Sequence, residues 1–402
     1  MVVLPRTFTY HNYADGRILG TIPINPFSEQ QYGSPWWCVH RADYQWTLFE
    51  AAIKRGVCVH LDHRVTDIDT DSTTVTVQHN GVKSNYVADL IIGADGIRSS
   101  VRNMILGNAD PGLRPSTICA YRALIPRSAM IEDELRAPLL DPDNAHVDVW
   151  LGPSHFLLSY PIRQDIKAQY NLVLVHPEND DHTTHDLPPH FPRPSFISEV
   201  SAHYTNFCSQ VRSIVSVIAP EDASDYYIAQ SGLAEKDGIL EWKLAELDAL
   251  PTWTSPQKTC VLVGDAAHAQ KPYLSAGASA AMEDAAALAT FLDRRHIARH
   301  GLPKLLEVFV AMRKPRAERY QTLSAADAVS WSLPDGPAQR RRDELLQFMG
   351  DEDRQKCADA MAKMRAEAIG EFNFGDSVFM DWAWKYDVVA DAEDILSKMT
   401  SS

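Results

Sequence analysis

The sequence predicts an α/β fold, because an apolar strand is followed by a glycine turn and a helix at two places far apart in the chain. The first of these units covers residues 89–104, and the second covers residues 259–292. Between them, residues 119–176 contain short alternating runs that are typical of antiparallel strands. The pattern therefore indicates an α/β layer with an inserted antiparallel sheet, followed by a helical C-terminal extension.

Turn and cap residues place the elements at the start of the chain. Asp15-Gly16 separates two apolar runs, which is a strong hairpin signal. Residues 41–55 repeat apolar side chains at helical spacing, and Gly56 follows them as a C-cap. Short strands are then expected at residues 57–60, 64–68, 73–79, 83–87 and 89–92.

The second half of the chain is richer in helices. A helix is expected at residues 197–211, and strands are expected at 238–244 and 259–263. A long Ala-rich helix should follow at residues 276–292. Pro315 should interrupt one of the later helices, because proline removes a hydrogen bond from a helix interior.

The composition favours a soluble cytoplasmic protein. The 38 Lys and Arg are outweighed by 53 Asp and Glu, which argues against nucleic acid as a partner. The six cysteines lie far apart with no Cys-x-x-Cys pair, which suits a reducing compartment and predicts neither a zinc site nor a disulfide framework. No run reaches the roughly 18 apolar residues that a membrane span requires.

A histidine-rich segment at residues 180–194 invites a metal interpretation. His182, His185 and His190 lie close to three aspartates there. The prolines of the segment favour an irregular loop, and no second cluster completes a tetrahedral set of ligands. We therefore expect a solvated loop and no metal site.

The strongest chemical signal follows the strand at residues 259–263. That strand ends on Gly264-Asp265, and an acid at this position can accept hydrogen bonds from ligand hydroxyls. Gly277 and Ala278 open the next helix, where small residues let a flat ligand approach backbone N–H groups. A capping Asp with Ala-mediated packing explains the Gly-Asp pair alone equally well.

The second signal is the run at residues 91–102, Ile-Ile-Gly-Ala-Asp-Gly-Ile-Arg-Ser-Ser-Val-Arg. Its acid, Asp95, could cap the following helix or contact a phosphate–sugar ligand through water. For this motif taken alone, a turn with a helix cap is the favoured interpretation.

Taken together, the order and spacing of the two motifs resemble the class A flavoprotein monooxygenases, the family of p-hydroxybenzoate hydroxylase and salicylate hydroxylase. Other segments match in the same order over nearly the whole chain, and the salicylate-hydroxylase-like branch looks most similar. These segments are His40-Arg41-Ala-Asp43, Ala120-Tyr121-Arg122, Trp150-Leu-Gly-Pro153, Tyr160-Pro-Ile, Glu241-Trp242-Lys-Leu and Pro334-Asp-Gly-Pro337.

The resemblance implies an FAD cofactor, NAD(P)H as co-substrate, and molecular oxygen. The implied reaction is hydroxylation of a phenolic or aromatic-acid substrate through a flavin C4a-hydroperoxide, with or without decarboxylation. Both a biosynthetic role in secondary metabolism and a catabolic role stay open.

The resemblance also assigns FAD contacts. Arg41 matches the arginine near the phosphates and the ribityl chain, although an ordinary surface ion pair would explain an Arg at a helix start. Asp265 matches the acid that binds the ribityl chain. Gly277 and Ala278 match the backbone N–H groups at the pyrimidine edge, whose dipoles favour an anionic reduced flavin. Pro272 matches the proline beside the flavin C4a position.

Two residues of the central strands match a pair that orients a phenolate in this branch. Arg122 can bind a carboxylate or phenolate oxygen and hold it charged, and Tyr160 accompanies it. A structural Arg–Tyr contact between strands would be an alternative role. His268 is assigned to packing and hydrogen bonding beside the flavin.

The sequence departs from the family in one respect. Members open with a strand, a Gly-x-Gly-x-x-Gly turn and a helix that holds the pyrophosphate, and the 19 glycines here include no Gly-x-Gly pair. We expect an additional N-terminal segment in a working monooxygenase. A flavin-poor pseudoenzyme that serves as a binding protein, and a flavin-free protein whose pocket catalyses a redox-neutral step, are the alternatives.

The expected architecture is a FAD-binding Rossmann-like domain, incomplete at its N-terminus, with an inserted substrate domain. The expected parts are residues 1–112 and 255–330 for FAD, 113–254 for the antiparallel substrate sheet, and 331–402 for the helical extension.

Overall fold

A computed structural model of the chain contains a large sheet, two smaller sheets and many helices, which confirms the predicted α/β class. The structure describes residues 2–163, 168–178, 193–218, 238–350, 354–367, 373 and 375–401. The chain divides into two compact units. The first unit comprises residues 1–57, 115–244 and 326–385, and the second comprises residues 58–114, 245–325 and 386–402. The four-part division expected from the sequence stays a prediction.

The first unit is built on an eight-stranded sheet in the order β11-β12-β7-β10-β9-β8-β1-β2. Its strands are β1 Thr7–Asn12, β2 Ile18–Pro23, β7 Leu113–Pro126, β8 His146–Leu151, β9 Phe156–Ile162, β10 Gln169–Pro177, β11 Arg193–Phe196 and β12 Gly238–Leu247. The predicted hairpin at Asp15-Gly16 joins β1 to β2. β1 pairs in parallel with β8, whereas β9 pairs antiparallel with both β8 and β10, and β10 pairs antiparallel with β7.

One face of this sheet is fully buried beneath two helices, α5 Ile197–His203 and α6 Ser209–Val215. The sequence predicts a single helix at residues 197–211, and this prediction is wrong. Three-residue turns follow the first helix, and the Cys208 N–H then bonds to the Tyr13 carbonyl at 2.6 Å and not to the preceding turn, so the helix does not continue. The core below contains side chains of both helices and of the central strands, among them Tyr170, Leu172 and Val211.

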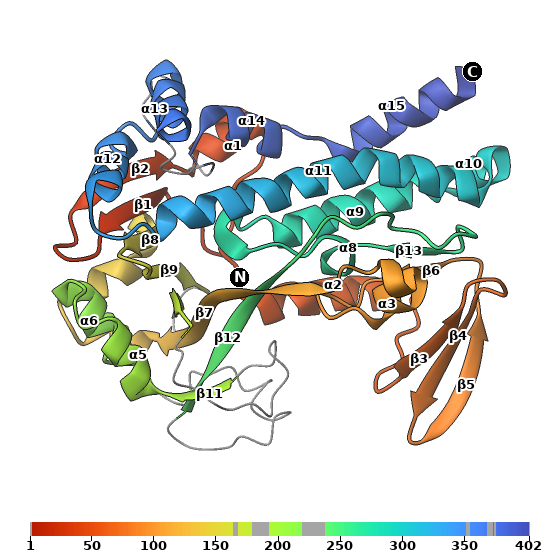
Figure 1. The fold of residues 1–402 in the computed structure, drawn as a ribbon, viewed down its shortest axis with the longest axis horizontal. Helices are drawn as coiled ribbons and strands as arrows, with labels where there is room; N and C mark the ends of the chain where they lie inside the picture. The colour runs from red at the N-terminus through yellow and green to blue at the C-terminus, as the bar shows by residue number, and fades with distance from the viewer. Residues whose placement is uncertain are drawn as a thin grey trace. The chain divides into compact units, whose positions relative to one another are not determined.

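The remaining helices of the first unit are α1 Phe27–Tyr32, α2 Arg41–Lys54, α4 Arg127–Ile131, α12 Pro337–Leu346, α13 Arg354–Ala366 and α14 Ser377–Trp384. α2 confirms the helix predicted at residues 41–55. The helices α12 to α14 confirm the predicted helical character of the C-terminal region (Figure 1). The strand predicted at residues 57–60 is absent: Val57 and Val59 are exposed, and this segment pairs with no described strand.

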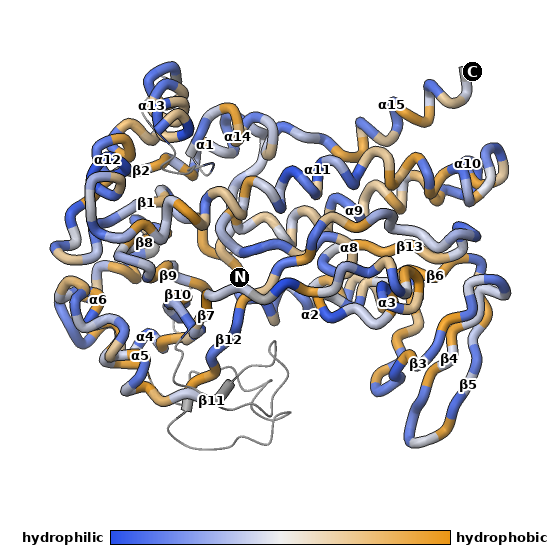
Figure 2. The backbone as a smooth tube through the Cα atoms, in the orientation of Figure 1, coloured by the Kyte–Doolittle hydropathy of each residue, from blue (hydrophilic) through white to orange (hydrophobic). Residues whose placement is uncertain are grey.

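The second unit contains a three-stranded antiparallel sheet and a two-stranded parallel sheet. The strands are β3 Arg64–Asp69, β4 Thr74–His79, β5 Val82–Val87, β6 Ile91–Gly93 and β13 Cys260–Leu262. Figure 2 colours β13 as hydrophobic, and all three of its residues are buried. β6 is only partly buried, contrary to the buried strand predicted at residues 89–92, because Ile91 faces the core and Ile92 is 47% exposed.

Helices pack around these strands: α3 Ser100–Leu106, α8 Asp265–His268, α9 Gly277–Phe291, α10 Arg294–His300, α11 Leu302–Trp331 and α15 Val388–Ser401. The prediction that Pro315 interrupts a helix is wrong, because α11 continues through it. Leu305, Phe309 and Ala317, on both sides of the proline, are buried in one core and hold the helix in place. No described helix is long and apolar enough to cross a membrane.

Candidate functional site

The seven residues that the sequence singles out are divided between the two units. The first unit carries Arg41, Arg122 and Tyr160. The second unit carries Asp265, Pro272, Gly277 and Ala278.

In the first unit, part of the sheet face opposite α5 and α6 is only half-buried, at strands β7, β9 and β10, whereas Ala120, Phe156 and Val175 on the same face are buried. Strand register places Arg122 opposite Val173, and Tyr160 opposite Asn171. Directly paired residues project to the same face, so these side chains lie in two adjacent rows across three strands. We call this surface the half-buried face, and it comprises Arg122, Leu124, Leu158, Tyr160, Asn171 and Val173.

The charges of Arg122 and Arg41 both act on Tyr160 in this unit. Burial raises the pKa of Tyr160 to about 12, the Cys38 thiol adds to this effect, and the positive charges of Arg122 and Arg41 oppose it. Tyr160 is therefore a neutral phenol near pH 7 and can donate a hydrogen bond. The arrangement offers two cations and a phenol to a ligand.

Arg41 is the first residue of α2 and is exposed. His40 caps this helix, its Nδ1 accepting from the Ala42 N–H at 3.2 Å. The nearby acid, Asp43, forms a bidentate pair with Arg163 at 2.8 and 2.9 Å, so it does not supply Arg41 with a surface ion pair.

In the second unit, β13 leads directly into the turn that presents Asp265. Gly264 adopts φ 58° there, and a Cβ on it would lie 3.2 Å from the Cβ of Ala281, so this position requires glycine. Asp265 is exposed as the first residue of α8. In the described part of the chain, no group forms a hydrogen bond or ion pair with its carboxylate.

Residues 272–278 follow, and we call this segment the cradle. Pro272 opens a short turn, and α9 begins at Gly277 with no side chain among the described residues capping it, so the first N–H groups of the helix are left for water or a ligand. A Cβ on Gly277 would lie 3.7 Å from Nε2 of Gln270 and 3.9 Å from Oδ1 of Asp265. The Oε1 atom of Gln270 is buried, and no described residue forms a hydrogen bond with it. These features fit the polar edge of a flat ligand.

Behind this cradle lies a charged network that the sequence did not reveal. Asp284 is fully buried, and its carboxylate accepts from the Gly264 N–H at 2.9 Å, from His268 Nε2 at 2.7 Å and from Arg313 Nε at 2.9 Å. Burial acts to raise the pKa of Asp284, but His268, Arg313 and the backbone donor outweigh it and hold the pKa below its ordinary value. The network therefore fixes the backbone of the Gly-Asp turn. The expected packing role of His268 is confirmed, since it is buried against Trp253.

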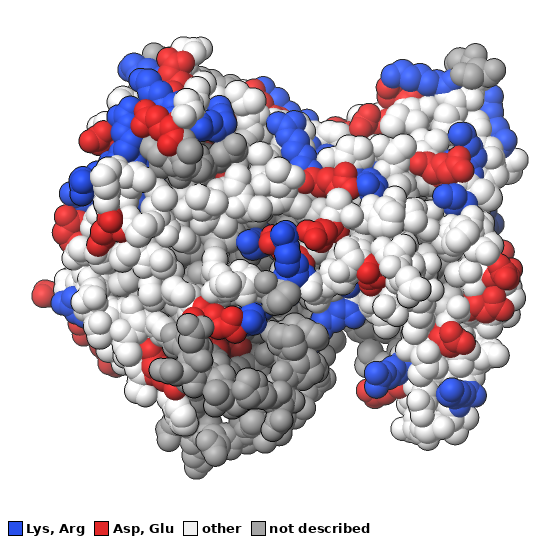
Figure 3. Space-filling model, in the orientation of Figure 1, with Lys and Arg blue, Asp and Glu red and all other residues white. Residues whose placement is uncertain are grey.

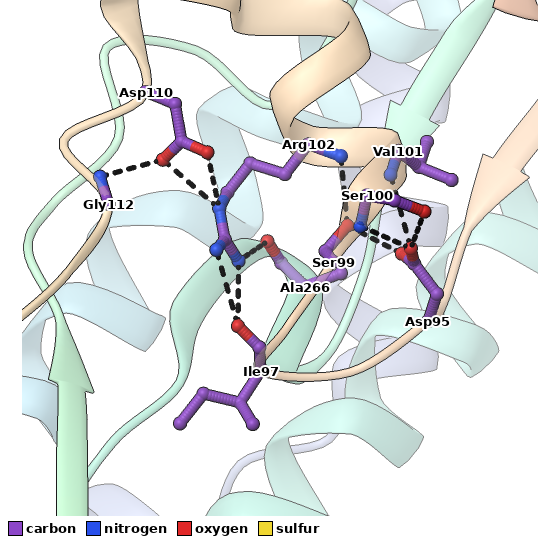
Figure 4. A network of polar contacts seen from close by, with 9 residues as sticks. All are labelled: Asp95, Ile97, Ser99, Ser100, Val101, Arg102, Asp110, Gly112 and Ala266. Atoms are coloured by element: carbon purple, nitrogen blue, oxygen red, sulfur yellow. Dashed lines mark hydrogen bonds and ion pairs between the residues drawn. The ribbon is translucent and has the colours of Figure 1, made fainter. Parts of the chain in front are cut away.

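The motif at residues 91–102 acts as a turn and a helix cap, as its favoured interpretation expects (Figure 4). The Asp95 carboxylate accepts from the Ser100 N–H at 2.8 Å and from the Val101 N–H at 3.1 Å. Arg102, which is buried, donates to both carboxylate oxygens of Asp110 and to the Ile97 and Ala266 carbonyls. Its guanidinium thereby ties the first motif to α8 of the second motif.

The histidine-rich segment at residues 180–194 falls almost entirely outside the described residues. Among the residues that are described, no group of His, Cys, Asp or Glu has a geometry that could hold a metal ion.

Comparison with known proteins identifies relatives over most of the chain. A family model described as "FAD binding domain" matches residues 22–112. An FAD-dependent monooxygenase of Beauveria bassiana (strain ARSEF 2860) is 27% identical over 346 residues, which are 85% of this chain and 73% of that protein. A 3-amino-4-hydroxybenzoate 2-monooxygenase of Streptomyces platensis is 29% identical over 83% of this chain and 73% of its own length. A solved salicylate hydroxylase substrate complex shares the fold, with a TM-score of 0.67 at 24% identity, over 98% of this chain and 83% of that one.

Proposed function

Because the chain belongs to the class A flavin-dependent monooxygenases, we propose that it hydroxylates a phenolic or aromatic-acid substrate with molecular oxygen and NAD(P)H. FAD is its cofactor. One relative acts on 3-amino-4-hydroxybenzoate, which supports a substrate of the hydroxybenzoate type. The observation that carries the proposal is the half-buried face, where Arg122 and the neutral phenol of Tyr160 lie together.

We propose that four residues of the second unit hold the cofactor. Asp265 would accept hydrogen bonds from the ribityl hydroxyls, while the role of Arg41 near the phosphates stays an expectation from the resemblance. The free N–H groups at Gly277 and Ala278 would meet the pyrimidine edge, where their dipoles stabilise negative charge. Pro272 would lie beside the flavin ring. When bound, FAD supplies the redox chemistry that passes electrons from NAD(P)H to oxygen.

The substrate would be held by the first unit. The Arg122 guanidinium would bind a carboxylate or phenolate oxygen of the substrate and keep it charged. A phenolate donates electrons to the aromatic ring and so favours electrophilic hydroxylation. Tyr160 stays protonated near neutral pH because burial raises its pKa, so its hydroxyl would donate to a second oxygen. The apolar neighbours Leu124, Leu158 and Val173 would contact the ring itself.

The surface chemistry supports a small-molecule substrate. Acidic and basic side chains are interspersed on the face shown in Figure 3, and the formal net charge of the chain is −15. We also propose that the enzyme is cytoplasmic and has no nucleic-acid partner, because its net charge is negative and its cysteines lie far apart.

The decisive experiment is the visible absorbance spectrum of the purified chain, desalted with and without prior addition of FAD. We expect flavin bands that remain with the protein, followed by NAD(P)H oxidation that depends on a hydroxybenzoate and by transfer of isotopically labelled oxygen to the ring. A colourless protein that takes up no added FAD would contradict the proposal for the chain as given. It would favour either a need for the additional N-terminal segment or a flavin-free binding or redox-neutral role.

A further inference from the structure

The half-buried face carries one polar residue that no motif accounts for. Asn171 is the third residue of β10, with Leu124 of β7 on one side and Tyr160 of β9 on the other. Val173 follows it on the same face of its own strand. Asn is depleted in strands, and an apolar side chain would suit this central position better. Its presence calls for an explanation other than sheet stability.

The amide group of Asn171 is also incompletely bonded. Its Nδ2 atom is buried and has no hydrogen-bond partner among the residues that the structure describes. The opposite face of the same strands differs, since the buried hydroxyls of Ser159 and Tyr170 bond to each other at 2.8 Å. A buried donor without an acceptor destabilises a protein, so it persists where a ligand supplies the acceptor.

The neighbours of Asn171 define what that ligand offers. Tyr160 is a protonated phenol and Arg122 is a cation, so the polar groups around Asn171 are hydrogen-bond donors. Apolar side chains surround them. Such a surface is complementary to a flat apolar ring that carries electron-rich oxygen atoms.

We propose that Asn171 is a substrate-binding residue whose amide donates a hydrogen bond to the phenolic oxygen of an aromatic acid. Asn171 thereby distinguishes hydroxylated rings from rings without the hydroxyl group, because a site built to bond an oxygen rejects a ligand that lacks it. This inference rests on the proposed function, and it adds a specificity-determining residue to it.

The test compares the binding of 2-, 3- and 4-hydroxybenzoate with that of benzoate, which lacks only the phenolic oxygen. Dissociation constants are measured by titration calorimetry on the FAD-treated protein for wild type and for Asn171→Leu. Wild type should bind its preferred isomer about tenfold more tightly than benzoate, a difference of about 1.4 kcal/mol. In Asn171→Leu this preference should fall to about twofold or less, with benzoate binding unchanged.

Two further variants serve as controls for this comparison. Asn171→Asp keeps the shape of the side chain but adds negative charge, so it should weaken binding of all four acids by about tenfold or more. Asn85→Leu, the same replacement on the exposed strand β5, is the matched control and should leave binding unchanged.

A separate readout excludes a merely structural role. Asn171→Leu removes an unpaired donor and should raise the melting temperature of the ligand-free protein by about 1–2 °C. A residue that served only the sheet would lower the melting temperature when replaced.

Retention of the full preference for the hydroxylated ring in Asn171→Leu would overturn the inference and leave the proposed function standing. A wild-type protein that binds none of the four acids would overturn both.

Discussion

Asp284 in the second unit and Asn171 in the first are both buried polar groups, but their bonding differs. The Asp284 carboxylate receives three donors at 2.7–2.9 Å and lies behind the turn that presents Asp265. The amide nitrogen of Asn171 has no acceptor in the described part of the chain and lies on the half-buried face of the sheet. One group is satisfied by the protein itself, and the other is not.

This difference in hydrogen bonding distinguishes residues that support the fold from residues that bind a ligand. A fully bonded buried group contributes to stability and fixes neighbouring backbone, because removing one partner leaves the others unsatisfied. A buried group without a hydrogen bond lowers the stability of the ligand-free protein. A ligand that supplies the missing partner removes this destabilisation. The same contrast exists between the bonded Asp284 and the exposed Asp265. We therefore expect substitutions behind the cradle to change folding, and substitutions on the ligand-facing surfaces to change binding.

The largest expected effect is that of Asp284→Asn. The amide cannot match the charge of Arg313 or accept all three hydrogen bonds, and the buried Arg313 keeps only its ion pair with Glu283, so unfolding should become easier by about 3 kcal/mol. Urea unfolding measures this loss. The control is Glu307→Gln, which removes an exposed pair with Lys304 and should change stability by less than about 0.5 kcal/mol. A loss below about 1 kcal/mol for Asp284→Asn would show that the network is not part of the scaffold.

Arg122→Ala should show the opposite behaviour. Loss of a charge-assisted hydrogen bond to the substrate should weaken hydroxybenzoate binding by about 1.5–3 kcal/mol, or roughly ten- to a hundredfold, while bound flavin is retained. Titration calorimetry and the flavin absorbance spectrum measure the two properties on the same sample. Arg127→Ala, which removes an exposed arginine of α4, serves as the control. Unchanged binding and turnover in Arg122→Ala would remove this residue from the proposed site.

The sequence predicted those parts of the fold that depend on neighbouring residues. The hairpin at Asp15-Gly16 and the helix that begins at Arg41 are set by local turn and cap geometry, and both are present. The helix break before Cys208 and the continuous helix through Pro315 depend on contacts with distant segments. Local propensity cannot anticipate such contacts, because tertiary packing overrides it.

The same reasoning explains which site residues could be named from the sequence. Asp265 and Gly277 belong to a contiguous motif, so their order and spacing single them out. Asn171 becomes informative only when strand register places it beside Tyr160. Asp284 had one available signal, a charged residue within an Ala-rich helix, but its three partners come from different parts of the chain.

A smaller effect concerns the scaffold side of the sheet in the first unit. Burial and the neighbouring His176 and His155 lower the pKa of His203 to about 4, although Glu241 and Glu199 oppose them. The unfolded state, with a histidine pKa near 6.5, binds more protons than the folded state between these values. Stability should therefore fall as the pH falls from about 6.5 to about 4.

We expect a loss of about 1 kcal/mol at pH 5 relative to pH 7.5 from this residue, allowing for its partial exposure to solvent. Urea unfolding at both pH values measures it, and His203→Gln should reduce the difference. His60→Gln, at an exposed histidine, should leave the difference as in wild type. If His203→Gln were equally sensitive to pH, the loss would have to come from other groups.

The smallest expected effect lies in the cradle itself, at Ser275. This residue adopts the left-handed conformation, with φ 51° and ψ 21°, immediately before α9 begins. That conformation destabilises a residue with a Cβ by about 1–2 kcal/mol, and the greater flexibility of glycine in the unfolded chain offsets part of any gain. Ser275→Gly should therefore stabilise the protein by about 0.5–1 kcal/mol.

The neighbouring Ala276, with φ −98° and ψ −9°, has an ordinary conformation, so Ala276→Gly should destabilise the protein by a similar amount. Thermal unfolding of both variants measures the two shifts. Opposite signs at adjacent positions would show that strain, like the unpaired donor of Asn171, is concentrated on the ligand-facing side, whereas a loss of stability in both would mean that the Ser275 side chain supports the fold.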